Sequence, residues 1–292
     1  MTASTEASAW PERSLAEADI EAAVGLSTQV GWNQVADDWR LMLRLGQGTG
    51  ICRPDGRLVA TALTLPFGSR FGWISMVIVD RGHRGLGLAM RLLKGCVERL
   101  EAGGLVAGLD AAPAGRPVYL KLGFHDIWGM QRFEAAGSGG LVPEVAPAGL
   151  RLRPIEAADW PAILAYDRAI FGGRREVLLR ELAARLPAAA LLAEGGGRLR
   201  GFALGRPGRL ATQVGPLQAD AAAIALALAA RSFAAITGPV FIDVPDRQGE
   251  LQRWLKAGNF RMQRPFTRML RGRTDPFDDT ARLFAPAGPE LA

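Results

Sequence analysis

The stretch Val77-Ile-Val-Asp-Arg-Gly-His-Arg-Gly-Leu-Gly-Leu-Ala-Met-Arg-Leu-Leu93 carries the strongest structural signal in this chain. It predicts a buried strand, a glycine-rich turn and the start of a helix. The first N–H groups of a helix have no partner within it, and the helix dipole adds partial positive charge at that end. Because Gly85, Gly87 and Ala89 are small, an anion can approach the backbone closely. The turn therefore predicts an anion site, most often one for phosphate.

Three kinds of phosphate-binding turn can be compared with this one. The dinucleotide fingerprint needs a small residue where this chain has Met90, and an acidic residue about twenty positions further on, which is absent. A P-loop needs Gly-Lys-Ser/Thr, which the stretch lacks. The acyl-CoA turn Gln/Arg-x-x-Gly-x-Gly/Ala fits at Arg84, Gly87 and Ala89, directly after an apolar strand. The spacing of these residues therefore favours an acyl-CoA-binding turn over the other two kinds.

The chain contains an internal repeat, which indicates a duplicated domain. Ser14-Leu-Ala-Glu-Ala-Asp19 is echoed by Pro154-Ile-Glu-Ala-Ala-Asp159, and Tyr119-Leu-Lys-Leu-Gly-Phe124 by Trp254-Leu-Lys-Ala-Gly-Asn-Phe260. Between the repeats, residues 134–149 (EAAGSGGLVPEVAPAG) lack periodicity and are rich in Gly, Ala and Pro, which is typical of a linker. The sequence thus predicts two domains, residues 1–135 and 151–292, joined by a linker at 136–150.

Strands and helices alternate in each half, with an antiparallel start and a parallel crossover. This order predicts an α/β (α+β) fold in which a mixed central sheet is flanked by helices. The elements expected around and after the turn are a strand at 73–79, a helix at 87–102, a strand at 106–110, a short helix at 116–122 and a last strand at 127–133. The second half is expected to repeat them, with its own last strand at 263–270.

With these motifs the chain resembles the GCN5-related N-acetyltransferase (GNAT) superfamily. The resemblance covers residues 15–134 and rests on the strand Trp73–Val79, the Arg-x-x-Gly-x-Ala turn and the Tyr119-to-Phe124 motif. Three further stretches are similar to tandem bacterial acetyltransferases of the YitH type: Gly31-Trp-Asn33 with Asp38-Trp39, Leu109-Asp-Ala-Ala-Pro-Ala-Gly115, and Arg264-Pro-Phe-Thr-Arg-Met269. The resemblance implies two tandem GNAT-like domains and acetyl-CoA as cosubstrate.

The resemblance also implies where acetyl-CoA binds. In this superfamily the central strand splays from its parallel neighbour at the glycine turn, and pantetheine pairs with the free strand amides. Carried over to this chain, the backbone of Val77, Ile78 and Val79 contacts pantetheine. The pyrophosphate is wrapped by Arg84, Gly85, Leu86, Gly87, Leu88 and Ala89. The alternative is a glycine-rich helix start without a ligand.

Tyr119 is the implied proton donor. The resemblance places its phenol beside the sulfur of CoA, where it can protonate the departing thiolate; a packing tyrosine is the alternative. The general base is not evident, because Trp73 stands where some relatives have a glutamate. Asp110 and His125 are candidates, as is a water chain, although Asp110 also fits as the cap of the following turn. At Ala112 many relatives have an asparagine that contacts the cofactor.

The acceptor wall is implied to include the segment with Trp32, Asn33, Asp37, Asp38 and Trp39. Aromatic and acidic side chains there would suit a cationic amine. The alternative is an amphipathic helix that buries its tryptophans.

The second half lacks the glycine turn and the tyrosine to which a role is assigned in the first half. Its counterpart of the turn is Gln213-Val-Gly-Pro-Leu-Gln-Ala-Asp220, in which Pro216 has no N–H to offer an anion. Trp254 replaces Tyr119 and cannot donate an acidic proton. We therefore expect a degenerate domain that keeps the fold, has lost acyl-CoA binding and covers the acceptor cleft. Phe266 and Arg268 could reach that cleft, but packing of their strand in the core is the favoured alternative.

Composition limits the classes of partner. The net charge is +6, but the basic residues are scattered without a Lys/Arg tract, which favours a solvated surface over a nucleic-acid site. Two cysteines without motif spacing predict free thiols, and two isolated histidines argue against a metal. The N-terminus has no apolar signal, and the longest apolar run is too short to span a membrane. We expect a cytoplasmic monomer or homodimer without nucleic-acid or membrane partners.

The leading hypothesis is an acetyl-CoA-dependent N-acetyltransferase. The N-terminal domain would move the acetyl group directly to an amine of a small molecule or peptide, without a covalent enzyme intermediate. The alternative is a non-catalytic acyl-CoA-binding or sensor protein, motivated by the missing base and by Ala112. A nucleic-acid binder is the third hypothesis, motivated by the scattered arginines, and it predicts a clustered basic face.

Overall fold

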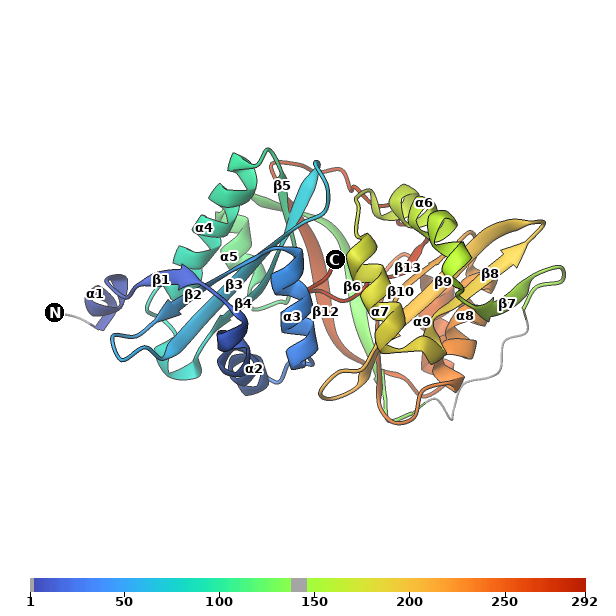
Figure 1. The fold of residues 1–292 in the computed structure, drawn as a ribbon, viewed down its shortest axis with the longest axis horizontal. Coiled ribbons are helices and arrows are strands. Elements are labelled where there is room, and N and C mark those ends of the chain that lie inside the picture. Colours follow the sequence, from blue (N-terminus) through green and yellow to red (C-terminus); the bar gives the residue numbers. More distant parts are fainter. Residues whose placement is uncertain (1–2, 138–145) are drawn as a thin grey trace.

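The two halves of the chain build one continuous mixed sheet with helices on both of its faces (Figure 1). The computed structural model describes residues 3–137 and 146–292, so residues 138–145 of the predicted linker lie outside the described residues. Most of the first half lies at one end of an elongated molecule and most of the second half at the other. Within the described residues, no helix has the length and apolar character needed to cross a membrane. The α/β fold predicted from the sequence is confirmed.

The first half has six strands and five α-helices within its described residues. The strands are β1 (Glu12–Ser14), β2 (Gln47–Cys52), β3 (Leu58–Pro66), β4 (Phe71–Val79), β5 (Val106–Ala111) and β6 (Phe124–Ala135). The helices are α1 (Ala3–Ser8), α2 (Ile20–Gln29), α3 (Ala36–Leu45), α4 (Leu88–Ala102) and α5 (Arg116–Lys121). The glycine turn thus lies between β4 and α4, as the sequence predicts.

The second half repeats this order. Its strands are β7 (Arg151–Pro154), β8 (Leu191–Gly195), β9 (Arg198–Arg206), β10 (Thr212–Ala219), β11 (Val240–Pro245), β12 (Arg261–Arg271) and β13 (Leu283–Ala285). Its helices are α6 (Trp160–Phe171), α7 (Glu176–Arg185), α8 (Ala222–Ala234) and α9 (Gly249–Ala257). Side-chain contacts repeat as well: Arg13 forms a two-armed ion pair with Asp19, and Arg153 forms the same pair with Asp159.

The sixth strand of each half lies beside the other half's fifth strand. The order across the sheet is β1-β2-β3-β4-β5-β12-β6-β11-β10-β9-β8-β7. β12 therefore pairs antiparallel with β5, and β6 with β11, while β6 and β12 pair with each other at the centre (Figure 1). The predicted boundary near residue 135 separates the repeats in sequence, yet β6 lies between two strands of the second half, β12 and β11, in the single sheet. The domain boundaries themselves stay a prediction.

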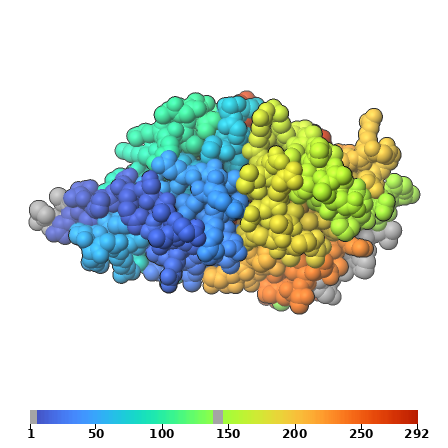
Figure 2. Space-filling model, viewed as in Figure 1, coloured from blue at the N-terminus to red at the C-terminus, as the bar shows by residue number. Residues whose placement is uncertain are grey.

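Helices from both halves share one apolar core. Trp39 and Met42 of α3 are fully buried in the same cluster as Leu178 and Leu182 of α7. Ion pairs also join the two helices, among them Arg185 with the buried Asp38 at 2.7 Å. Figure 2 shows this seam on one face, where the blue first half meets the yellow second half without a break. The shared core holds the two halves in a fixed relative position.

Candidate active site

The central strand β4 separates from its parallel neighbour β5 halfway along its length. Parallel pairing runs from Phe71 to Trp73, the latter opposite Gly108, and does not continue beyond it. On its other edge β4 stays paired with β3, where Ile78 lies opposite Thr61. Met76 has a positive φ of 51° at the bulge between these strands. One edge of β4 therefore faces a gap over the stretch predicted to contact pantetheine.

A cavity of about 790 Å³ occupies this gap. Its walls include Val77, Ile78 and Val79 of the predicted pantetheine stretch. From the predicted pyrophosphate turn they include Arg84, Gly85, Gly87, Leu88 and Ala89. Leu86 is the exception, because it packs on the apolar core beneath α4. The volume lies in the range of ordinary small-molecule sites.

The glycine turn has the conformation of an anion cradle. Gly85 and Gly87 have φ values of 79° and 78°, which residues with a side chain rarely adopt. The first intrahelical bond runs from the Arg91 N–H to the Gly87 carbonyl at 3.1 Å, so the preceding N–H groups have no intrahelical acceptor. A Cβ added to either glycine would meet no atom within 4 Å, so it would project into open space. The fold leaves room for a ligand against the backbone here.

Asp80 fixes the start of the turn. Its carboxylate accepts hydrogen bonds from Gly82 N–H (3.0 Å) and Gln29 Nε2 (3.0 Å) and contacts His83 Nδ1 at 2.8 Å. Burial alone would raise the pKa of Asp80, but these contacts and the charge of Arg57 outweigh burial and lower the pKa to about 2. Asp80 therefore remains a carboxylate and organises the turn at neutral pH.

Tyr119 lies on α5 and lines the cavity. Its ring meets the edge of Phe124 with the centroids 6.1 Å apart. A Cβ on Gly115 would lie only 3.2 Å from the Tyr119 hydroxyl, so this glycine makes room for the phenol. Burial raises the pKa of Tyr119 to about 12, which keeps the phenol protonated at neutral pH. It can therefore act as a hydrogen-bond donor into the cavity.

Asp110 lines the cavity, but both of its oxygens are already engaged. Arg268 of β12 donates to them through Nε and Nη2, each at 2.9 Å, and reaches Asp278 through Nη1 at 2.6 Å. Burial raises the pKa of Asp110 to about 6, against the opposing charge of Arg268. This ion pair differs from the turn cap that the sequence suggested. The role of Asp110 as a base stays a prediction.

The other candidates lie in less favourable places. His125 is exposed on β6 and does not line the cavity. Trp73 is buried and donates from Nε1 to the carbonyl of Pro289 at 2.9 Å. Ala112 does line the cavity and offers no polar group there.

A second group of residues lining the cavity lies outside β4, the glycine turn and α5. They come from the loop before α3, from β6, from β12 and from the C-terminal segment (residues 286–292): Trp32, Asn33, Gln34, Arg132, Arg264, Phe266, Pro289 and Glu290. We name this set the acceptor wall. Of the residues predicted for it, Trp32 and Asn33 take part, whereas Asp37 is exposed, Asp38 is paired and Trp39 lies in the core. Phe266 of β12 also lines the cavity, whereas Arg268 does not.

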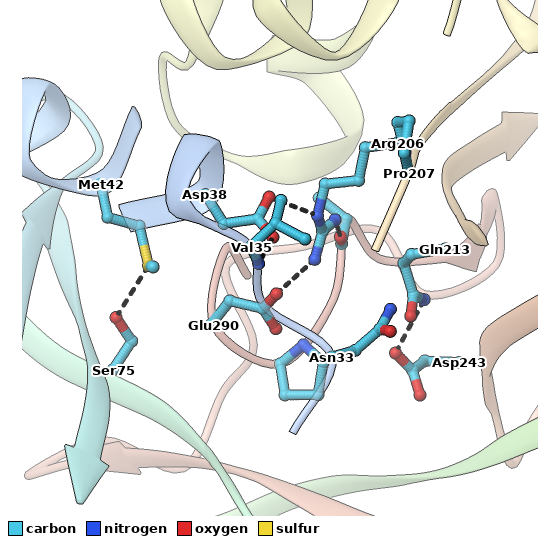
Figure 3. Close-up of polar contacts among 12 residues, drawn as sticks. Asn33, Val35, Asp38, Met42, Ser75, Arg206, Pro207, Gln213, Asp243 and Glu290 are labelled. Carbon is cyan, nitrogen blue, oxygen red and sulfur yellow. Dashed lines mark hydrogen bonds and ion pairs between the residues drawn. The ribbon is translucent and has the colours of Figure 1, made fainter. Parts of the chain in front are cut away.

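The second half holds the acceptor wall in place. The side chain of Asn33 accepts from the N–H groups of Leu210 (2.8 Å) and Ala211 (3.0 Å) and donates to the Ala211 carbonyl (2.9 Å). In Figure 3, Arg206 lies between Asp38 of α3 and Glu290 of the C-terminal segment and pairs with both. The wall is thus built from both halves of the chain.

Glu290 is a carboxylate that sequence reasoning missed. Burial would raise its pKa, but the charge of Arg206, a hydrogen bond from Gln34 and the charge of Arg132 hold the pKa of Glu290 below its usual range. No motif marks residues 286–292, so only the path of the folded chain reveals that they reach the cavity. Arg132 lies in no motif either, and Arg264 begins a stretch shared with tandem acetyltransferases but was assigned no role in the site.

The corresponding gap in the second half is filled by protein. β10 separates from β11 after Val214, as β4 separates from β5. β13 pairs with β10 there, with Ala285 opposite Leu217, on the edge that β9 leaves free. Trp254, the counterpart of Tyr119, stacks against Phe233 at 6.1 Å. β13 therefore occupies the place in the second half that corresponds to the cavity of the first half.

Comparisons with known proteins agree with this architecture. A family model described as "Acetyltransferase (GNAT) family" matches residues 20–124, and another described as "Acetyltransferase (GNAT) domain" matches residues 163–285. The chain belongs to the GNAT acetyltransferase superfamily, as the sequence motifs predicted, with one such domain in each half.

Similar proteins and solved structures match this chain over most of its length. The Bacillus subtilis (strain 168) protein YitH, an uncharacterized N-acetyltransferase, is 26% identical over 238 residues, which are 81% of this chain and 83% of YitH. A crystal structure from Pyrococcus horikoshii has a TM-score of 0.79 at 18% identity and covers 97% of this chain and 95% of its own. A tandem GNAT protein from the clavulanic acid biosynthesis pathway has a TM-score of 0.62 at 15% identity, covering 91% and 99%.

Proposed function

We propose that this protein is an acetyl-CoA-dependent N-acetyltransferase whose N-terminal half catalyses direct transfer to an amine. One observation carries the proposal: a single cavity joins the free edge of β4, the glycine turn and Tyr119 to a separate acceptor wall. The turn can receive the pyrophosphate, and the free amides of Val77–Val79 can pair with pantetheine. The acceptor is proposed to be a small-molecule or peptide amine, and the enzyme a cytoplasmic monomer or homodimer.

The proposed reaction proceeds without a covalent enzyme intermediate. The amine nitrogen attacks the thioester carbonyl, and the C–S bond breaks as the C–N bond is completed. Strand amides polarise the carbonyl, and the cavity holds amine and thioester in line, which removes much of the entropic cost. Tyr119 hydrogen-bonds the departing thiolate and can protonate it. The proton of the attacking amine leaves through Asp110 or through water.

A non-catalytic acyl-CoA-binding protein is the second candidate. It is favoured by the ion pair of Asp110 with Arg268, which leaves that carboxylate without a free oxygen. An assay of CoA release against a library of amines separates the two candidates. Acetyl-amine products with stoichiometric CoA release support the enzyme, and binding without release across the library supports the sensor.

Calorimetry tests the cofactor and its location together. We expect one acetyl-CoA per chain, because β13 fills the gap between β10 and β11 that corresponds to the cavity of the first half. Two sites per chain would contradict the assignment of acetyl-CoA to the first half alone. An absence of heat at millimolar acetyl-CoA would overturn the proposed function.

The substitution Gly87→Ala is expected to weaken acetyl-CoA binding about tenfold, because its Cβ would occupy space that the ligand needs. Gly56→Ala is the matched control: Gly56 has a φ of 85° in the β2–β3 turn, also has open space at its Cβ, and lies outside the cavity. Each variant should lose about 1–2 kcal/mol of stability from the left-handed backbone. Calorimetry should find normal affinity in Gly56→Ala, and equal affinity in both variants would contradict the assignment.

A further inference from the structure

The acceptor wall contains a cation without a partner. Arg264 of β12 lies opposite Arg132 of β6 and lines the cavity. Its Nε is buried and makes no hydrogen bond in the part of the chain that the structure describes, and no carboxylate there lies within ion-pair distance of it. Its guanidinium lies 5.0 Å from the ring centre of Phe266. A half-buried guanidinium whose donors are unused normally costs stability.

The carboxylates around Arg264 are committed to other arginines. Asp243 accepts from Nε and Nη2 of Arg132, each at 2.8 Å, and from Gln213 at 3.1 Å. Glu290 pairs with Arg206 (Figure 3). Burial and the charge of Arg132 lower the pKa of Arg264, although the charges of Asp243 and Glu290 partly oppose this. The wall therefore has one positive charge in excess.

We propose that the acceptor amine carries a carboxylate group and that Arg264 binds this group during transfer. The inference rests on the proposed function and names the class of acceptor. A guanidinium pairs with a carboxylate through two parallel hydrogen bonds, and the free donors of Arg264 can supply them. Phe266, which lies beneath the guanidinium, supports the apolar body of such a substrate.

A carboxylate fits this wall better than a phosphate does. One unpaired cation balances one negative charge, whereas a phosphate monoester carries about −1.5 to −2 at neutral pH. The phosphates of CoA have their own site at the glycine turn, whose residues come from a separate part of the chain. The charged groups that act on Arg264 all belong to the acceptor wall or contact it: Arg132, Asp243 and Glu290.

Matched amines test the proposal. The probes are phenylalanine, phenylalaninamide and phenethylamine, then 6-aminohexanoate and hexylamine, with phosphoethanolamine as the phosphate arm. CoA release is measured for the wild type, Arg264→Gln, Arg264→Lys and Arg261→Gln. Arg261 is the control because it is exposed on the same strand and does not line the cavity. Calorimetry of acetyl-CoA with each variant provides an independent readout.

We expect the wild type to prefer a carboxylate-bearing probe to the counterpart that lacks the carboxylate or carries an amide in its place. Arg264→Gln should lower kcat/KM for that probe by about ten- to a hundredfold, as expected for a lost charge-assisted hydrogen bond. Arg264→Lys should lose less, Arg261→Gln nothing, and acetyl-CoA affinity should stay unchanged in every variant.

The outcomes separate this inference from the proposed function. Normal acetyl-CoA binding with no preference for the carboxylate, with a preference for phosphoethanolamine, or with no effect of Arg264→Gln overturns the inference alone. Weaker acetyl-CoA binding in Arg264→Gln also overturns the inference, because Arg264 would then bind an anionic group of CoA rather than the carboxylate of the acceptor. Normal acetyl-CoA binding without CoA release from any probe also counts against it. If the wild type does not bind acetyl-CoA, the proposed function fails and the inference with it.

Discussion

Tyr119→Phe is expected to lower kcat by about a hundredfold or more, the usual size of a general-acid contribution, and to leave the affinity for acetyl-CoA nearly unchanged. The hydroxyl lies in the cavity wall, and its raised pKa of about 12 keeps the proton on the phenol at neutral pH. The phenol can therefore donate a hydrogen bond to the CoA thiolate, whose negative charge develops only as the C–S bond breaks. Removing the hydroxyl should therefore affect the transition state rather than the bound ground state.

The chain supplies its own control for this substitution, since its other tyrosine is Tyr166. The Tyr166 hydroxyl donates to Asp220 at 2.8 Å and does not line the cavity. Tyr166→Phe should lose about 1 kcal/mol of stability with an unchanged kcat. Steady-state kinetics on an accepted amine, with calorimetry of acetyl-CoA, measures both effects. An unchanged kcat in Tyr119→Phe would remove Tyr119 from the mechanism.

The parts of the site that the sequence could predict are those set by local chain geometry. The turn at Gly85 and Gly87 depends on left-handed backbone angles, which glycine signals directly. Tyr119 follows at a spacing that the intervening helix and strand fix. Both lie in one continuous segment of the first half, and both reach the same cavity.

The placement of β6 and β12, each beside a strand of the other half, could not be predicted in the same way. β6 and β12 have apolar patterns that fit either half, because the repeated halves offer each strand two equivalent neighbours. Which neighbour is chosen depends on side chains far apart in sequence, such as the pairing of Arg268 with Asp110 and of Arg132 with Asp243. The acceptor wall could not be predicted for the same reason. Arg264 reaches it because β12 lies beside β6, and Glu290 reaches it because the C-terminal segment returns to the cavity.

Arg268→Met is expected to destabilise the protein by about 3–5 kcal/mol, the cost of leaving buried charges without their partner. The guanidinium joins Asp110 of β5 to Asp278, and it stacks between Trp73 (4.6 Å) and Trp128 (4.4 Å). The methionine retains part of the apolar packing between these rings, so the loss reports mainly on charge. Urea unfolding measures it, and Arg13→Met, which breaks a half-exposed pair with Asp19, should cost at most about 1 kcal/mol.

The pH dependence distinguishes lost charge from lost packing in Arg268→Met. The pKa of Asp110 is raised by burial to about 6 in the folded protein, so its ionisation reduces stability as the pH rises through this range. Without Arg268 the folded pKa of Asp110 rises further, so the variant goes on losing stability as the pH rises above about 6, where the wild type no longer does. The stability difference between variant and wild type should thus shrink from about pH 8 to about pH 5, and it should shrink less in Arg268→Met with Asp110→Asn. A difference independent of pH would mean that Arg268 holds β12 against β5 by packing alone, and that the choice of strand partner does not depend on the ion pair.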